Sequence, residues 1–297
     1  MPEQWRRHTG QWQSSPWSGS MLEHAHAHDH GQLTLEERHE HEAETYDELA
    51  KLFLEQWGEE EYLLDRATPP FPNKEHVSFL GYALDQIGPL EGKRILEAGT
   101  GTGNLLVWFA MNGAEVVGND VSAGVMEVAR KRASINGVLE GVDFVHQPIE
   151  SLDHPAGSFD VVFGNVVAHH FDVGRAGRNI YRLLKPGGVA VFSEPVLFAP
   201  DWVSKLRTSS AVTRYFPDVK HSPDERAFSR RMLTEFSEPF DSVDLRYFQI
   251  LGRVQNFAQV SDETWARIEK VDTWLLDHVP WLYPVSRWVV MTMRKAD

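Results

Sequence analysis

The chain has 297 residues, a formal net charge of −14 at pH 7 and no cysteine. Without cysteine there are no disulfides, thiolate metal sites or thiol nucleophiles. The negative charge argues against nucleic acid as a substrate, because binding to nucleic acid depends on basic side chains that neutralise phosphates. No apolar run reaches the roughly 20 residues that span a bilayer. We therefore expect a cytoplasmic globular protein with no membrane insertion, and no pattern specifies its oligomeric state.

Residues 1–33 differ in composition from the rest of the chain. They combine scattered Trp, Ser, Gln and Gly with an alternating His tract, and they lack a helical or strand period. Such a segment buries too little apolar surface to fold, so we expect a disordered leader. A flexible His tract lacks preset geometry and supporting groups, so we expect no functional metal there. The tract consists of His24, His26, His28 and His30.

A helix is predicted directly after this leader. Thr34 and Glu37 have the spacing of a capping box, in which each side chain bonds the backbone of the other residue. Tyr46, Leu49 and Phe53 then fall on one helical face.

Residues 90–195 form the predicted core, in which short apolar strands alternate with helices. This alternation predicts a parallel, doubly wound sheet. Helices are expected from Asn104, over 123–136 and over 174–184, where Lys185-Pro186-Gly187-Gly188 ends the last of them. The predicted strands are 94–98, 115–119, 142–146, 159–164 and 189–194.

Two more strands, 242–251 and 286–294, are predicted near the end of the chain. They complete a Rossmann-like, doubly wound sheet of seven strands with the last one antiparallel. Residues 34–297 then form one domain, with cap insertions at about 196–227 and 253–285 over the ligand crevice. The aromatic residues of these insertions suggest a pocket for an apolar or aromatic molecule. They are Phe198, Trp202, Tyr215, Phe216, Trp274, Trp281 and Tyr283.

The strongest motif is the glycine loop Glu97-Ala98-Gly99-Thr100-Gly101-Thr102-Gly103, which follows a predicted strand and opens a helix. Alternate glycines let the backbone pass close to a ligand, in the context of a nucleotide site. Asp120 follows about twenty residues later, where an acid accepts hydrogen bonds from both ribose hydroxyls. Ser122 can cap the next helix, which leaves Asp120 for the ligand.

A dinucleotide-dependent dehydrogenase is the obvious competing class. Its loop needs a third glycine five residues after the first, for close helix–strand packing, and that position here is Asn104. Glu97 would also repel a pyrophosphate, whereas it would attract the ammonium of an amino-acid moiety. The loop therefore favours an adenosyl amino acid.

With these motifs the chain resembles the class I S-adenosylmethionine (SAM)-dependent methyltransferases, particularly their ubiquinone/menaquinone-biosynthesis-like branch. The resemblance runs from about Tyr46 to Glu194. Residues 97–103 and 117–122 are similar to the first two SAM motifs, and 158–162 and 184–188 to later landmarks. It implies SAM as cofactor and a small-molecule acceptor. The implied cofactor-binding residues are Tyr46, Glu97, Gly99, Thr100, Gly101, Gly103, Asp120, Val121, Ile149, Glu150 and Asn165.

One position departs from the family pattern. Pro148 stands where the family usually places an Asp that contacts the adenine amino group. Proline has neither a side-chain acceptor nor a backbone donor. Adenine then depends on the amide of Ile149 and apolar packing, with help from Gln147. The departure also keeps open a second class, a catalytically inactive SAM-binding partner or scaffold protein.

Methyl transfer to a hydroxyl requires alignment and removal of a proton. His169 and His170 follow the fourth predicted strand, and related small-molecule O-methyltransferases use a His here as base. The pair can equally cap the next helix. Glu194, at the end of the fifth strand, is expected at the same rim, where it orients a His, takes a proton or bonds a loop amide. We expect transfer to oxygen, rather than nitrogen or carbon, of an apolar or aromatic metabolite or natural product, with no metal.

Overall fold

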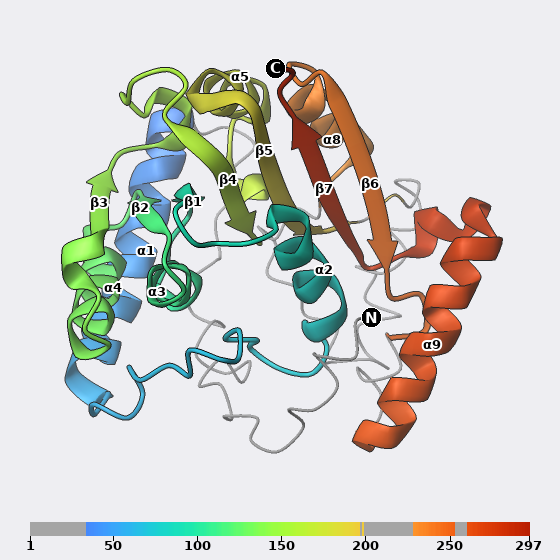
Figure 1. Cartoon of the computed structure of the whole chain (residues 1–297), viewed down its shortest axis with the longest axis horizontal. Coiled ribbons are helices and arrows are strands. Elements are labelled where there is room, and N and C mark those ends of the chain that lie inside the picture. The colour runs from blue at the N-terminus through green and yellow to red at the C-terminus, as the bar shows by residue number, and fades with distance from the viewer. Residues whose placement is uncertain (1–33, 197, 199–227, 253–259) are drawn as a thin grey trace.

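The computed structural model describes residues 34–196, 198, 228–252 and 260–297 (Figure 1). The predicted leader, most of the first predicted insertion and the start of the second lie outside the described residues. The domain boundaries expected from the sequence therefore stay a prediction. No described helix is both long and apolar enough to cross a bilayer.

A seven-stranded sheet forms the centre of the protein (Figure 1), in the order β3-β2-β1-β4-β5-β7-β6. The first five strands are parallel, and β7 is antiparallel to both of its neighbours. This confirms the predicted Rossmann-like sheet. The strands are β1 (Arg94–Ala98), β2 (Glu115–Asp120), β3 (Val142–His146), β4 (Phe159–Asn165), β5 (Leu184–Pro195), β6 (Ser242–Phe248) and β7 (Trp288–Arg294).

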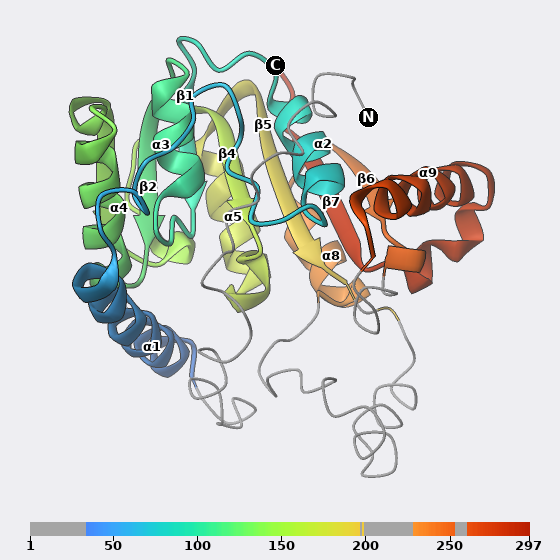
Figure 2. The ribbon, with the colours of Figure 1, turned by 90° about the horizontal axis from the view of Figure 1, so that it is seen from below.

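Helices cover both faces of the sheet, as Figure 2 shows. Buried side chains of α2 (Val77–Ile87) and α3 (Asn104–Met111) pack on one face. Those of α5 (Val173–Leu183) and α8 (Arg230–Ser237) pack on the other. Burial on both faces explains why the central strands read as continuous apolar runs. Beyond the edge strand β6 lies α9 (Asp262–His278).

Helix α1 (Leu35–Gln56) begins with the predicted capping box. The Glu37 amide donates to Thr34 Oγ1 at 3.2 Å, and the Thr34 amide donates to Glu37 Oε2 at 2.7 Å. Leu49 and Phe53 are buried in a cluster with residues of α4 (Ala123–Ile135). Figure 2 shows α1 lying beside α4 at one end of the sheet.

The largest differences from the predicted strand boundaries lie in β5 and β6. Strand β6 ends at Phe248, not at Leu251, because Gln249 has φ 62°, a left-handed conformation that breaks an extended strand. The helix α5 ends at Leu183, directly before residues 185–188, as predicted, but these residues also belong to β5, which starts earlier than expected. There Leu184 pairs with Phe159, and a register shift precedes the regular pairing of Val161 with Val189.

Candidate active site

Backbone hydrogen bonds hold the glycine loop against the end of β2. The amides of Gly99 and Thr100 both donate to Asn119 O, at 2.8 and 3.0 Å. Gly99 and Gly101 have φ of 70° and 52°, which favours glycine. A Cβ at Gly99 would lie 2.2 Å from Val167 Cγ2, whereas a Cβ at Gly101 would meet nothing within 4 Å. Gly99 is therefore required for packing, and Gly101 leaves space beside the loop for a ligand.

Asp120 ties the second strand to this loop. Its Oδ2 accepts from the Gly101 amide at 2.9 Å, and its Oδ1 accepts from the Ser122 amide at 3.0 Å. Burial raises the pKa of the carboxyl, and these backbone hydrogen bonds partly oppose the rise. Ser122 caps α4 by accepting from the Val125 amide, as predicted. The prediction that Ser122, and not Asp120, caps α4 is therefore confirmed.

Glu97, directly before the loop, is a buried acid with an orphaned oxygen. It is 5% exposed, and its Oε2 has no hydrogen-bond partner among the described residues. Burial raises its pKa well above the ordinary value, and the nearby Asp120 adds to the rise. An ammonium group would satisfy this oxygen, so the residues fit the amino-acid end of SAM.

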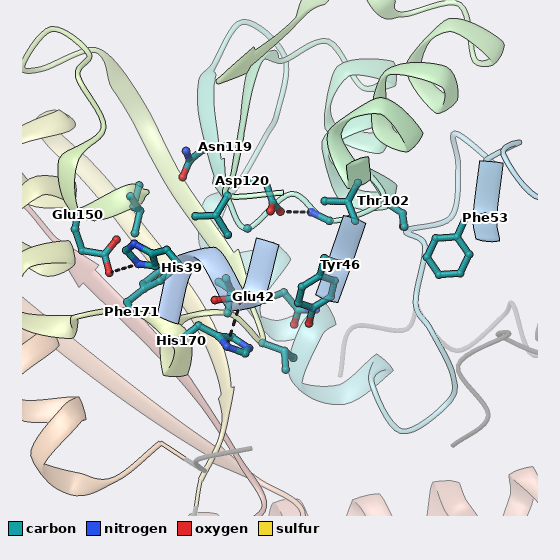
Figure 3. A pocket seen from close by; sticks show the side chains of 18 residues that line it. His39, Glu42, Tyr46, Phe53, Thr102, Asn119, Asp120, Glu150, His170 and Phe171 are labelled. Carbon is teal, nitrogen blue, oxygen red and sulfur yellow. Dashed lines mark hydrogen bonds and ion pairs between the residues drawn. The ribbon is translucent and has the colours of Figure 1, made fainter. Parts of the chain in front are cut away.

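A cavity lies at this end of the parallel strands, and Figure 3 shows the side chains of its wall. Most of the predicted cofactor residues line it: Tyr46, Gly99, Gly101, Asp120, Val121, Ile149, Glu150 and Asn165, together with His170. Its wall does not include Glu97, Thr100, Gly103, His169 or Glu194. Gly103 instead caps α3 in a left-handed conformation. The cofactor-binding roles of all these residues stay predictions.

The two histidines of the turn η6 (Ala168–His170) point to different places. His170 lines the cavity, and its Nδ1 lies 3.3 Å from Glu42 Oε1. His169 is buried, and its Nδ1 lies 2.8 Å from Glu194 Oε2. Of the two, only His170 is therefore placed to contact a molecule in the cavity.

Glu194 was expected at the rim of the crevice, but the structure buries it completely. Its Oε1 accepts from the amides of Val167 and Ala168 at 2.8 and 2.7 Å. The preceding residue, Val166, has φ 56°, a costly conformation for a β-branched residue. The carboxylate thus compensates a strained turn, and this is why it lies behind the wall rather than on it.

The segment after β3 accommodates Pro148 as the residue before the turn η5 (Ile149–Ser151). Ile149 is buried and lines the cavity, as expected for adenine packing. Gln147 Oε1 accepts from the Asp153 amide at 3.1 Å, and Gln147 is not among the described residues that line the cavity, so its help with adenine stays a prediction. Glu150 lines the cavity, and its buried Oε2 has no hydrogen-bond partner among the described residues.

Sequence reasoning missed the ionisable wall residues of α1, His39 and Glu42. His39 Nε2 lies 3.5 Å from Glu150 Oε1, so it reaches across to the segment after β3. A signal existed, because residues 39, 42 and 46 have the spacing of one helical face and Tyr46 was already implicated. Asn119, Thr102 and the apolar Val125, Val166, Val167, Phe53 and Phe171 complete the wall.

The aromatic residues of the predicted insertions are only partly described. Phe198 and Tyr283 cluster with Tyr247 at the end of β6, with ring centroids 5.2 to 6.1 Å apart. Trp274 and Trp281 are exposed. Trp202, Tyr215 and Phe216 lie outside the described residues, as does the His tract. Within the described ranges, no group of three or more His, Asp or Glu side chains is arranged to hold a metal ion.

A buried arginine on α4 supports the glycine loop from behind. Arg132 is 2% exposed and donates to the carbonyl oxygens of Thr102, Glu61 and Tyr62. Burial lowers its pKa to about 10, so it stays charged near neutrality.

Replacing Arg132 with Met is expected to destabilise the protein by about 2–4 kcal/mol, because three carbonyls, two of them in buried hydrogen bonds, lose a charged donor. The melting temperature should fall by roughly 4–15 °C in calorimetry. Arg130→Met is the matched control, since Arg130 is exposed on the same helix. Equal melting temperatures for the two variants would contradict the supporting role of Arg132.

Comparisons with known proteins agree with this geometry. A methyltransferase domain family matches residues 96–192. The chain is 31% identical to a ubiquinone biosynthesis O-methyltransferase of Pectobacterium atrosepticum, over 58% of this chain and 70% of that protein. It is 26% identical to a ubiquinone/menaquinone biosynthesis C-methyltransferase of the same organism, over 60% of this chain and 78% of that protein.

Solved structures show the same fold. Geranyl diphosphate C-methyltransferase from Streptomyces coelicolor A3(2) is similar with a TM-score of 0.56 and 15% identity, over 87% of this chain and 98% of that one. Phosphoethanolamine N-methyltransferase 2 from Haemonchus contortus is similar with a TM-score of 0.55 and 16% identity, over 89% of this chain and 61% of that one. At these identities the likeness concerns the fold alone.

The sheet and its glycine loop define a Rossmann-like nucleoside-binding enzyme fold. The sequence relatives specify it further: the chain belongs to the class I SAM-dependent methyltransferase family, in the ubiquinone/menaquinone-biosynthesis-like branch. It is a SAM-dependent methyltransferase that acts on a small molecule. The alternative of an inactive SAM-binding scaffold is not favoured.

Proposed function

We propose that this enzyme transfers the methyl group of SAM to a hydroxyl oxygen of an apolar or aromatic small molecule. When bound, SAM supplies an electrophilic methyl group on a positively charged sulfur. Glu97 and the glycine loop hold its amino-acid end, Asp120 accepts from the ribose hydroxyls, and Ile149 packs against adenine. These roles are supported by the orphaned oxygen of Glu97 and by the positions of Asp120 and Ile149 on the cavity wall.

The observation that carries the proposal is the position of His170 on the cofactor cavity, next to a carboxyl group. A hydroxyl nucleophile must lose its proton, and imidazole is the suitable acceptor near neutral pH. Glu42 faces Nδ1 of the ring, so the acceptor hydroxyl delivers its proton to Nε2. The carboxylate of Glu42 then stabilises the charged imidazolium.

His169 and Glu194 act in this proposal as positioning residues. Their mutual bond and the bonds from Glu194 to two turn amides keep η6 in place. The ring of His170 lies against that of His169, with centroids 4.1 Å apart, so a fixed His169 also fixes His170. This supports an indirect role for both residues: of the alternatives expected for Glu194 from the sequence, it favours orienting a His and bonding loop amides over taking a proton.

The charge of the site bears on the class of acceptor. Among its described wall residues the cavity contains Glu42, Asp120 and Glu150 but neither Lys nor Arg. Such a wall disfavours phosphorylated acceptors, because no Lys or Arg among its described residues neutralises a phosphate. The name of the O-methyltransferase relative supports oxygen as the methylated atom, and that of the C-methyltransferase relative makes carbon the second candidate.

The test is turnover of methyl-labelled SAM with a panel of phenols, apolar alcohols, the matching amines and the phosphorylated alcohols. We expect label on the oxygen of phenols or apolar alcohols, identified by mass spectrometry and NMR of the product. Label found only on carbon or nitrogen would overturn oxygen as the nucleophile. A preference for the phosphorylated acceptors would overturn the argument from the charge of the wall.

A further inference from the structure

Helix α1 contributes one of its faces to the cofactor cavity. His39, Glu42 and Tyr46 all line it, at the spacing that places residues on one side of a helix (Figure 3). His39 is paired with Glu150. Glu42, which lies between His39 and Tyr46 along the helix, is paired with His170. The N-terminal helix therefore places a carboxyl group over the middle of the site.

This carboxyl group is held in place by the packing of α1 on α4. Asp47, on the same helix, accepts from the Ser122 hydroxyl and from the Gly124 amide, at 2.5 and 2.7 Å. A Cβ added at Gly124 would lie 2.9 Å from Ala50 Cβ, so the two helices approach closely at this point. Glu42 is thus part of a fixed wall, one turn before this anchored stretch.

The surroundings of Glu42 are predominantly acidic. Burial raises its pKa to about 8, and the negative charges of Asp120 and Glu150 contribute to the rise. The opposing positive groups are few, and they are mainly histidines. The charged and titratable groups around it are Arg38 and His39 on α1, Asp120 on β2, Glu150 in η5, and His169 and His170 in η6.

SAM and its product, S-adenosylhomocysteine, differ at this site in one charge. Both carry an ammonium and a carboxylate on the amino-acid end, but only SAM has the positive sulfonium. A partly buried carboxyl group such as that of Glu42, which lacks a strong cationic partner, gains from a cation in the same cavity. The product has no positive charge at the sulfur.

We propose that Glu42 makes the cavity selective for the cofactor, with its positive sulfonium, over the product, whose sulfur is neutral, by releasing its proton to solvent when SAM binds. This inference rests on the proposed location of the cofactor in the cavity. It assigns to α1 a role in specificity as well as in covering the site. Release of the product is then favoured, because after transfer the positive charge lies on His170 and no longer on the sulfur, so the carboxylate no longer attracts the cofactor product.

The proposal predicts how the affinity for SAM changes with pH, including the direction of the change. Glu42 is mostly protonated below its raised pKa of about 8, so SAM must displace a proton there. SAM affinity should rise with pH, by up to about tenfold per unit below pH 8, and level off above it. About 0.9 proton should be released per SAM bound at pH 7. Binding of S-adenosylhomocysteine should release far less.

The experiment is isothermal titration calorimetry with SAM and with S-adenosylhomocysteine, in two buffers of different ionisation enthalpy. In Glu42→Gln we expect SAM affinity to fall about tenfold, affinity for the product to stay within about twofold, and proton release to disappear. Glu42→Asp should keep part of the selectivity, because it retains the charge. Glu44→Gln, an exposed glutamate of the same helix, is the matched control.

Equal losses of affinity for both ligands in Glu42→Gln would overturn the proposal and leave α1 a structural cover. Unchanged SAM affinity, or unchanged proton release, would overturn it as well. No acceptor takes part in these titrations, so they are independent of whether oxygen is methylated. If neither ligand binds even to the wild type, the cofactor site itself is wrong.

Discussion

Replacing His170 with Ala should lower kcat by about 10²–10⁴-fold, the usual contribution of a general base. The affinity for SAM should change little, because the imidazole serves the acceptor and not the cofactor in our proposal. The pair with Glu42 explains why this particular histidine is suited to the role: it lies on the cavity wall with a carboxyl group at Nδ1. The measurement is steady-state turnover with the acceptor that the panel identifies, together with calorimetric SAM affinity.

Two further histidine variants make this prediction specific. His278→Ala is the control, since His278 is exposed at the end of α9 and should leave kcat unchanged. His169→Ala should lower both kcat and the melting temperature, because its loss leaves Glu194 with an unpaired oxygen in a buried turn. A His170→Ala enzyme with full turnover would remove His170 as the base. It would also favour an acceptor that needs no deprotonation, such as an amine.

Replacing Asp120 with Ala should weaken SAM binding by about 100-fold or more. Two effects combine, because charge-assisted hydrogen bonds to the ribose are worth roughly 1.5–3 kcal/mol each. In addition, Oδ2 accepts from the Gly101 amide and holds the glycine loop in place. Calorimetry with SAM and with S-adenosylhomocysteine measures the effect, and both ligands should lose affinity alike because both contain the ribose.

That equal loss separates Asp120 from Glu42, whose removal should affect SAM alone. Asp120→Asn should fall between wild type and Ala, since the amide oxygen still accepts but without charge. Asp143→Asn is a suitable control, because Asp143 is exposed on the neighbouring strand β3. Unchanged SAM affinity in Asp120→Ala, in a protein with the wild-type melting temperature, would refute the assignment of the ribose site.

Local patterns in the sequence determined the sheet and the cofactor half of the site. Short segments rich in Val, Ile, Leu and Phe predicted β1 to β4 to within one residue, because the strands of a sheet covered on both faces favour apolar side chains. The glycine loop could be predicted from the sequence as well, because the positive φ of Gly99 and Gly101 depends on the local backbone and not on distant residues. The role of Ser122 as helix cap could also be predicted, because an N-cap side chain bonds an amide only three residues further along the chain.

The tertiary structure alone decided which polar groups face the cavity and which support it from behind. His169 and His170 are adjacent in sequence, yet one is buried against Glu194 and the other faces Glu42. Nothing local distinguishes them, because the difference arises from β5 on one side of the turn and α1 on the other. Glu42 is the clearest case. Its amphipathic helix was predicted, but its contact with a turn more than a hundred residues away depends on how α1 packs against α4, and no helical period encodes that packing.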